Sequence, residues 1–402
     1  MGRYLNSSTP YALYQGETNQ PYFVDKSLLL AELFPVLDAG NQHICITRPR
    51  RFGKTIMANM IAAFLSKKVD SDSIFSRLKI TSNLKYKEYR NKYNVISIDF
   101  SKISRSCDSY SDYIGKIETT LIRDLKKEYP QIEVYEDDSA ADVLETIFEE
   151  CNQERFVFVL DEWDFIFHKD FINEENKKQY IQFLSNLLKD RPYVQMTYMT
   201  GILPIAKYSD GSELNMFDEY DMACKEKYSE YFGFLDEEVD QLYDIYKKIT
   251  KNPKILRSEL KEWYDGYLFG NTEIYNPWSV INYFNNNCKP KAFWSRTSGN
   301  EIIGELIRSS DKEVYESLSL LLQGKEVQSI INTDIIYPEV NADSDTIYSF
   351  LLVAGYLRAT SVISEFNDNP ICSLKLPNRE IKSVFQKEIL DNCSFSNYIG
   401  IN

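Results

Sequence analysis

The stretch Ile44–Thr55, ICITRPRRFGKT, decides how the first part of this chain is expected to fold. Ile44–Ile46 predicts a short buried strand, and Thr47–Phe52 predicts a tight, basic loop. Gly53–Thr55 then begins a helix that continues as IMANMIAAFLSKK. A helix N-terminus has unpaired N–H groups and a partial positive charge, so this one is expected to attract an anion.

A strand, a loop, Gly-Lys-Thr and a helix, in this order, form the phosphate-binding arrangement of P-loop nucleoside triphosphatases. Gly53 lets the backbone approach the ligand, Lys54 would reach the β- and γ-phosphates, and the Thr55 hydroxyl would hold Mg²⁺. Arg50 and Arg51 could add positive charge at the phosphates or act across a subunit boundary; solvated or ion-paired arginines are the alternative. The predicted nucleotide-binding residues of this stretch are Pro49, Arg50, Arg51, Phe52, Gly53, Lys54, Thr55 and Ile56.

The match to the P-loop pattern is incomplete. The full pattern has a glycine five residues before Gly53, and this chain has Arg48 there. Gly-Lys-Thr alone is a weak signal, because an ordinary helix start with a solvated Lys54 would look the same. The context that decides between the two interpretations comes from a second stretch.

That second stretch is Phe156–Asp164, FVFVLDEWD. Its five consecutive apolar residues predict a strand buried on both faces, as in a parallel sheet. Parallel strands present ligand groups at their carboxyl ends, so Asp161 is expected to hold Mg²⁺ and Glu162 to orient or deprotonate a water molecule. A polar exit from a buried strand is the alternative for this pair. Taken together with Lys54 and Thr55, the order and spacing favour a triphosphatase.

A further strand is predicted for Val194–Gly201, VQMTYMTG. Thr200 at its end could sense the γ-phosphate of a bound nucleotide. A strand end that merely turns the chain at Gly201 is the equal alternative.

Composition and charge narrow the class of protein. A length of 402 residues predicts two or three domains, and a net charge of −14 argues against a surface that as a whole binds nucleic acid or anionic membrane. The seven cysteines are scattered without a CxxC pair, which fits free thiols in a reducing compartment. No signal peptide and no apolar run of membrane-spanning length is visible, so a cytoplasmic protein without a membrane partner is predicted.

Elements elsewhere in the chain follow from local patterns. Residues 1–20 are expected to be loop, residues 93–100 a strand, and residues 106–153 and 171–190 largely helical. The polar stretch 208–222 is expected to end the nucleotide-binding domain. Further on, a helix is predicted to end at Gly270, residues 293–325 are predicted to be largely helical, and short strands are expected within 328–340 and 361–378.

With these residues in view, the chain resembles the AAA-ATPase-like family of P-loop proteins, which often carry a C-terminal PD-(D/E)XK-type nuclease domain. The similar stretches are YFVDKSLL, RPRRFGKT, FVLDEWD, TYMTGIL, WYDGYLFG, IYNPWSV, FWSRTSGN, FLLVAGYL and LKLPNREIKSVF, and they occur in this order along nearly the whole chain. In that family the first glycine of the P-loop pattern is often absent, as it is at Arg48. Trp163 and the weakly basic loop after Gly201 are departures from the family pattern.

The resemblance implies an α/β fold with an additional-strand, AAA-like P-loop core, a helical lid and a winged-helix-like module. Domains are expected at 1–225, 226–300 and 301–402. The strand at 93–100 is expected to lie between the P-loop strand and the acidic strand. Too few residues follow LKLPNREIKSVF in this sequence for a nuclease fold, so no DNA cleavage by this chain is expected.

The resulting hypothesis is an ATPase that uses ATP and Mg²⁺, with Lys54 and Glu162 as catalytic residues, Thr55 and Asp161 at the metal, and Thr200 at the nucleotide. Hydrolysis would move the C-terminal module, in a nucleic-acid-related or defence process. The alternative is a hydrolysis-poor switch or scaffold in which ATP controls binding of a protein or nucleic-acid partner. Homo-oligomers, and GTP in place of ATP, stay open.

Overall fold

The structure is a computed structural model, and it divides into two compact units. The described residues are 1–102, 107–205, 213–221, 227–250, 253, 257–296, 312–332, 343–366 and 369–392. The first unit consists of Met1–Thr47 and Gly53–Tyr220, and the second of Arg48–Phe52 and Asp221–Asn402. Among the described residues, no helix is long and apolar enough to cross a membrane.

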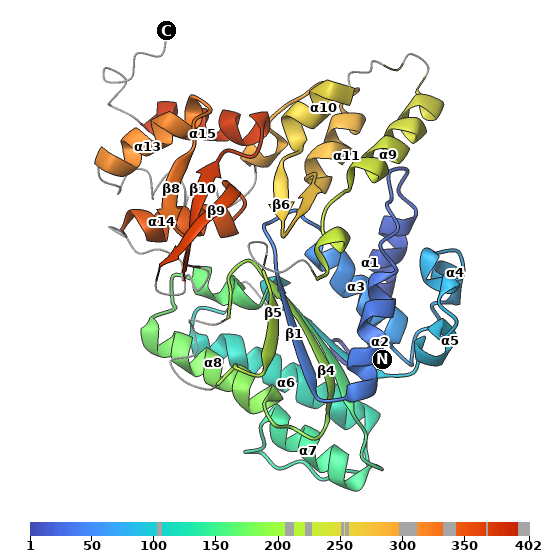
Figure 1. Ribbon diagram of the computed structural model, residues 1–402. Coiled ribbons are helices and arrows are strands. Elements are labelled where there is room, and N and C mark those ends of the chain that lie inside the picture. The colour runs from blue at the N-terminus through green and yellow to red at the C-terminus, as the bar shows by residue number, and fades with distance from the viewer. Residues whose placement is uncertain are drawn as a thin grey trace. The chain divides into compact units, whose positions relative to one another are not determined.

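A parallel five-stranded sheet forms the centre of the first unit (Figure 1). Its strand order is β2-β3-β4-β1-β5. The strands are β1 (Gln42–Thr47), β2 (Asn94–Asp99), β3 (Phe156–Asp161), β4 (Val194–Gly201) and β5 (Phe217–Tyr220). The predicted α/β fold with a parallel P-loop-type sheet is therefore confirmed.

The sequence-based assignment of the inserted strand is wrong. Strand β4 lies between β1 and β3, whereas β2, within the stretch 93–100, lies at the sheet edge outside β3. Local patterns predict that a strand exists, but its neighbours depend on which way each connection crosses the sheet. Strand β5 was not predicted either. It pairs with β1 at the other edge and is only half-buried, so the polar stretch that contains it shows no apolar pattern.

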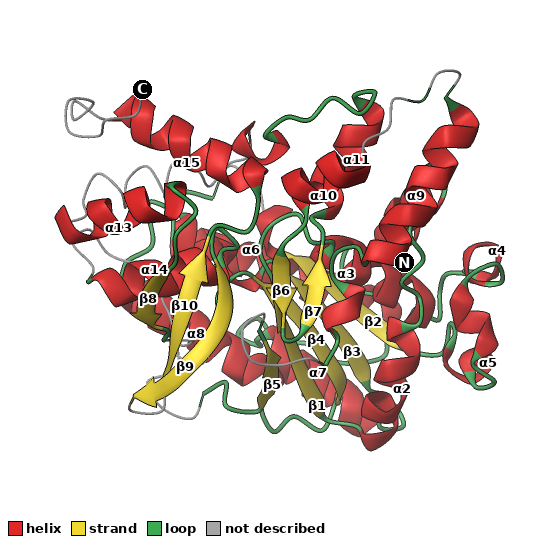
Figure 2. Cartoon of the chain, turned by 45° about the horizontal axis from the view of Figure 1, so that its top comes forward, coloured by secondary structure: helices red, strands yellow, loops and turns green. Residues whose placement is uncertain are grey.

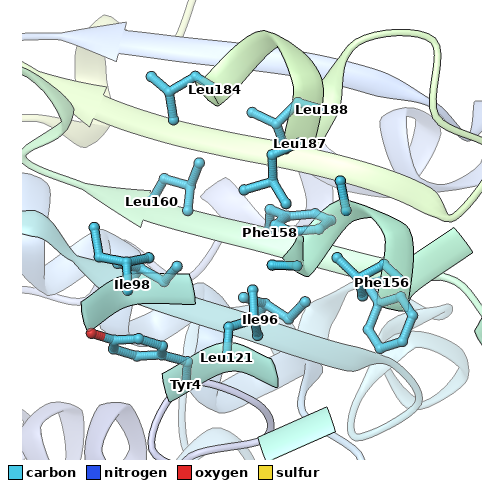
Figure 3. Close-up of a cluster of buried hydrophobic side chains, with 14 of the residues drawn as sticks. Tyr4, Ile96, Ile98, Leu121, Phe156, Phe158, Leu160, Leu184, Leu187 and Leu188 are labelled. Atoms are coloured by element: carbon cyan, nitrogen blue, oxygen red, sulfur yellow. The ribbon is translucent and has the colours of Figure 1, made fainter. Parts of the chain in front are cut away.

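Helices cover both faces of this sheet, so its central strands β1, β3 and β4 are almost entirely buried. Helices α6 (Tyr110–Glu128), α7 (Ala140–Glu150) and α8 (Glu174–Leu188) cover one face (Figure 2). Figure 3 shows the core there, where side chains of β2 and β3 meet those of α6 and α8. The labelled residues are Tyr4, Ile96, Ile98, Leu121, Phe156, Phe158, Leu160, Leu184, Leu187 and Leu188.

The opposite face is covered by α3 (Lys54–Leu65), which packs against β2, β3 and β4, and by α2 (Leu29–Ala39) beside β1. Helix α1 (Thr9–Thr18) packs on α3, so the expectation that residues 1–20 are loop is wrong. Its composition is polar, but the buried Tyr14 ring stacks on Phe75 with the ring centroids 5.6 Å apart. Tertiary packing of this kind stabilises a short helix whose local pattern is weak.

Short helical segments connect these elements. They are α4 (Asp72–Phe75), η1 (Lys79–Ser82), α5 (Tyr86–Tyr89), η2 (Phe100–Lys102) and η3 (Trp163–His168). The last of them directly follows the acidic end of β3 and becomes important for the site.

The second unit contains helices and two small antiparallel sheets. Its elements are η4 (Ser229–Tyr231), α9 (Asp236–Ile249), α10 (Arg257–Tyr264), β6 (Tyr267–Phe269), β7 (Thr272–Ile274), α11 (Pro277–Asn285), η5 (Phe293–Arg296), α13 (Lys312–Leu322), β8 (Val327–Ile330), α14 (Ser344–Val353), β9 (Arg358–Phe366), β10 (Asn369–Lys375) and α15 (Arg379–Asn392). Strands β8, β10 and β9 form the larger sheet in that order. The lid, the winged-helix-like module and the domain boundaries at 225 and 300 remain predictions. Parts of the predicted helical stretch 293–325 and of the predicted strand 328–340 lie outside the described residues.

The helix expected to end at Gly270 ends earlier. Helix α10 stops at Tyr264, and the residues up to Phe269 form strand β6 instead. Gly266 makes the turn with a φ of 95°, and a Cβ there would lie 2.2 Å from the Pro377 carbonyl oxygen. Glycine is therefore required both by its backbone conformation and by the close approach of a distant segment.

One buried carboxylate, that of Glu380, connects three elements of the second unit. Glu380 lies in the first turn of α15 and is fully buried. It accepts hydrogen bonds from the Ser279 hydroxyl of α11 at 2.7 Å and from the Trp294 N–H of η5 at 3.0 Å. Burial raises the pKa of Glu380 to about 7, and these hydrogen bonds only partly oppose the effect.

This raised pKa predicts a pH dependence of stability. The folded state holds the Glu380 proton more tightly than the unfolded state, so its contribution is complete below the unfolded pKa and is lost as pH rises through the folded pKa of about 7. A shift of this size corresponds to roughly 3 kcal/mol. We expect Glu380→Gln to flatten the decline in unfolding free energy between about pH 5 and pH 8.

Urea unfolding of both proteins across this pH range measures the difference, with the exposed Glu262→Gln variant as the control. Parallel pH profiles for wild type and Glu380→Gln would contradict the prediction.

Candidate functional site

The N-terminus of α3 forms one side of the site. Gly53 has a φ of 87°, in the left-handed region that favours glycine, and the helix begins directly after it at Lys54. Lys54 is only 4% exposed, while Thr55 and Ile56 are half-buried. A nearly buried lysine at a helix N-terminus concentrates positive charge at one end of the sheet.

The carboxyl ends of β3 and β4 form the other side. Met199 pairs with Leu160, which brings the next residues, Thr200 and Asp161, side by side. The Thr200 hydroxyl donates a hydrogen bond to Asp161 Oδ1, and the Thr55 side chain is also hydrogen-bonded to Asp161. Three residues from separate parts of the sequence thus converge, while their roles at a nucleotide and a metal stay predictions.

Asp161 is an electrostatically unfavourable place for a negative charge. Burial raises its pKa to about 6, and the neighbouring charges of Glu162 and Asp99 add to the effect, while the hydrogen bonds from Thr200 and Thr55 oppose it. Its Oδ2 atom is buried and has no hydrogen-bond partner among the described residues. A cation at Oδ2 would relieve both the missing contact and the charge repulsion.

These donors fit Mg²⁺ better than a metal that needs a complete set of protein ligands. Among the described residues, no group of three or more histidine, cysteine, aspartate or glutamate side chains could hold a metal ion. Mg²⁺ commonly binds through one or two protein oxygens, with waters and substrate phosphates completing the shell. The Asp161 carboxylate and the Thr55 hydroxyl could supply such oxygens.

Glu162 follows Asp161 in a left-handed conformation, with φ 55° and ψ 47°, and is half-buried. The next acidic residue, Asp164, is a site residue that the sequence analysis missed, although it lies inside the quoted stretch FVFVLDEWD. Burial, followed by the charge of Glu162, raises the pKa of Asp164 to about 6, and the positive charge of Lys54 opposes this shift. Asp164 therefore belongs to the same charged cluster as Lys54.

The loop before Gly53 explains the departure at Arg48. Arg48–Phe52 belongs to the second unit, where Arg48 is fully buried. Its guanidinium lies over the Phe269 ring at 5.1 Å and the Phe232 ring at 5.5 Å from the ring centroids. The Phe52 ring packs against Phe269 and Tyr267, with centroids 5.1 and 4.9 Å away. Position 48 thus has a packing role that glycine could not fulfil.

The other predicted residues of this loop also have contacts within the second unit. Pro49 packs so closely on Gly355 that a Cβ at 355 would lie 2.8 Å from the proline ring. Arg51 is exposed, has a φ of 73° and lies over the Trp278 ring at 4.3 Å. Arg50 is half-buried, and partial burial of Arg51 followed by the positive charge of Arg50 lowers the pKa of Arg51. Whether either arginine contacts a phosphate stays a prediction.

Three comparisons with known proteins place these observations in context. Residues 15–209 match the model of a family described as predicted AAA-ATPase. An uncharacterized protein in the vnfD 5′ region of Azotobacter chroococcum mcd 1 is 22% identical over 381 residues, which are 93% of this chain and 67% of that protein.

Two solved structures are distantly similar. One is the Walker-type ATPase PABY2304 of Pyrococcus abyssi, with a TM-score of 0.47, 11% identity, and coverage of 90% of this chain and 94% of that one. The other is the Aeropyrum pernix ORC2 protein in ADPNP-ADP complexes, with a TM-score of 0.37, 11% identity, and coverage of 91% and 93%.

The buried charge of Asp161 leads to a stability prediction for the protein without nucleotide and Mg²⁺. Because the folded pKa of about 6 exceeds the unfolded value, ionisation of Asp161 weakens the fold as pH rises through 6. We expect Asp161→Asn to raise the unfolding free energy at pH 8 by about 1–3 kcal/mol. The gain should be small near pH 4, where the folded wild type carries a protonated Asp161. Denaturant titrations at the two pH values provide the measurement, and an equal or lower stability of the variant at pH 8 would contradict the prediction.

Arg48 leads to a second prediction, because Arg48→Gly restores the complete P-loop pattern. We expect this variant to lower the unfolding free energy by about 2 kcal/mol, since a desolvated guanidinium over two aromatic rings is lost, and to bind nucleotide no more tightly. Arg3→Gly is the control, because Arg3 is exposed and is not among the residues proposed to bind nucleotide. Thermal unfolding and calorimetric titration measure the two effects. Tighter nucleotide binding by Arg48→Gly at unchanged stability would contradict the prediction, because it would show that glycine at position 48 favours nucleotide binding at no cost in stability.

Proposed function

We propose, on the premise that residues 15–209 belong to the predicted AAA-ATPase family, that this chain binds ATP with Mg²⁺ and hydrolyses it. The observation that carries the proposal is the convergence of the Thr55 and Thr200 hydroxyls on the buried Asp161 carboxylate, at the end of the sheet where the N-terminus of α3 begins. A cluster of this composition suits a triphosphate and a divalent cation.

Each residue has a role that its surroundings support. Lys54 would neutralise charge on the β- and γ-phosphates, and the free N–H groups of the first turn of α3 would donate to phosphate oxygens. Thr55 and Asp161 would hold Mg²⁺, which when bound supplies positive charge to the phosphate oxygens. Thr200 orients Asp161 through its hydroxyl and stands close to where a γ-phosphate would lie. By their place in the chain, Pro49–Phe52 are proposed to line the nucleotide.

Glu162 is the proposed catalytic base. It would accept a proton from, or orient, the water that attacks the γ-phosphorus, as the bond from that phosphorus to the bridging oxygen breaks and ADP and phosphate form. Lys54 stabilises the charge that develops on the leaving oxygen. No covalent intermediate with the protein is required, because such sites work by positioning and electrostatics.

Replacement of the base tests the proposal. We expect Glu162→Gln to lower kcat for ATP hydrolysis by about 100-fold or more while the Kd for ATP stays within a factor of about three, since the change removes the proton acceptor and keeps the shape. Glu174→Gln, the same chemical change at an exposed position at the start of α8, should leave both constants unchanged. Phosphate release and calorimetric titration measure the two constants.

Two outcomes would argue against ATP hydrolysis by this chain. A wild-type protein that binds ATP without turnover under any condition favours the alternative of a nucleotide-controlled switch for a protein or nucleic-acid partner. A wild-type protein that gives no binding heat with nucleotide and Mg²⁺ removes the proposal. Movement of the C-terminal unit on hydrolysis, and a cytoplasmic location, are parts of the proposal that rest on the family resemblance and the composition.

A further inference from the structure

A buried carboxylate, that of Asp164, connects the segment after β3 to the segment after β4. Asp164 is 1% exposed and lies in η3. Its Oδ2 atom accepts hydrogen bonds from the backbone N–H groups of Ile202 and Leu203, both at 2.9 Å. One oxygen thus holds two successive N–H groups, and these directly follow Thr200 and Gly201 at the end of β4.

The two segments also fit closely at Gly201. A Cβ on Gly201 would lie 2.4 Å from the Trp163 indole ring and 2.9 Å from Asp164 Oδ1. Trp163 is fully buried, and its carbonyl oxygen accepts a hydrogen bond from the Tyr180 hydroxyl of α8 at 2.7 Å. The segment that carries Asp164 is therefore itself held by the helix layer, so it provides a fixed support for the turn after β4.

This support acts close to the proposed metal ligand. The Thr200 hydroxyl, two residues before Ile202, donates to Asp161, and Asp161 lies three residues before Asp164. A short closed path of covalent bonds and hydrogen bonds therefore connects Asp164, the backbone of residues 201–203, Thr200 and Asp161. A rigid path of this kind fixes side-chain orientation in the way that outer hydrogen-bond partners orient metal ligands.

We propose that Asp164 is a positioning residue for the hydrolysis proposed above, on which this inference rests: by holding the N–H groups of Ile202 and Leu203, it sets the place of the Thr200 hydroxyl against Asp161. The essential property of Asp164 is the position of an acceptor oxygen. Its negative charge is secondary, because the backbone N–H groups can donate to a neutral amide oxygen as well.

Three replacements at position 164 separate the position of the oxygen from the charge. Asparagine keeps an acceptor oxygen at the same distance from the backbone and removes the charge. Glutamate keeps the charge and moves the oxygen by one methylene. Alanine removes both and leaves two buried N–H groups without this acceptor.

We expect Asp164→Asn to retain kcat for ATP hydrolysis within about fivefold of wild type, and Asp164→Ala and Asp164→Glu to lose about 10- to 100-fold with little change in the Kd for ATP. A role of the charge alone predicts the reverse order, with glutamate retaining activity and asparagine losing it. That reverse order would overturn the proposal.

A double-mutant cycle with Thr200→Val tests the path itself. If Asp164 acts through Thr200, then Asp164→Ala should cost little further activity in the Thr200→Val background. Losses of kcat that multiply in the double variant would overturn the proposal, because they would show that the two residues act independently. Circular dichroism and thermal unfolding of each variant establish that the fold persists, and if the alanine variant does not fold, the glutamate variant takes its place in the cycle.

Amide hydrogen exchange at Ile202 and Leu203 needs no nucleotide and separates this inference from the proposed function. Slow exchange in wild type and Asp164→Asn, with fast exchange in Asp164→Ala or Asp164→Glu, is expected. Equal exchange rates in all of these proteins would show that Asp164 does not hold these two N–H groups, even if ATP hydrolysis is real. Conversely, a wild-type protein that does not bind ATP removes the proposed function and the positioning role with it. The exchange data would still report on the hydrogen bonds from Ile202 and Leu203 to Asp164.

Discussion

The buried carboxylate of Asp161, at the end of a strand covered on both faces, is the constraint on which the site depends. Strand β3 is buried at every position, so polar groups can occur only where it ends. All strands of this sheet are parallel, so their carboxyl ends lie at the same edge, and the chain leaves β1 there to begin α3. The polar side chains at the carboxyl ends of β3 and β4 and in the first turn of α3 therefore gather at one edge of the sheet.

Crowding of acids gives this edge its chemical character. Four acidic residues lie at or just after strand ends, namely Asp99, Asp161, Glu162 and Asp164. Burial, followed by repulsion from neighbouring acids, raises the pKa values of Asp161 and Asp164. Lys54 supplies one compensating charge, and a bound cation would supply more. Neutral hydroxyl and backbone N–H donors hold the two buried carboxylates in fixed orientations. The Thr200 hydroxyl does this for Asp161.

The incomplete motif has a physical explanation. In the usual pattern, the first glycine of the loop allows close backbone approach, but here position 48 carries an arginine that is buried among aromatic rings of the second unit. The second glycine, Gly53, is retained at a position with a φ of 87°, where an L side chain would be strained. The glycine of the pattern is thus present at position 53, where the backbone conformation requires it. It is replaced by arginine at position 48, where the larger side chain packs among aromatic rings.

The amino-acid sequence by itself determined the elements that local physics specifies strongly. Five consecutive apolar residues before Asp161 and Glu162 predicted a buried strand, and Gly53 followed by Lys54 predicted a helix start. It also pointed to Thr55, Asp161 and Thr200 as members of one site. What only the tertiary structure decided was the place of each strand in the sheet, the half-buried edge strand β5, the helical state of Thr9–Thr18, and the roles of Arg48 and Asp164. The physical reason is that these features depend on contacts between segments far apart in the chain, such as Asp164 with the N–H groups of Ile202 and Leu203, which no local pattern of residues encodes.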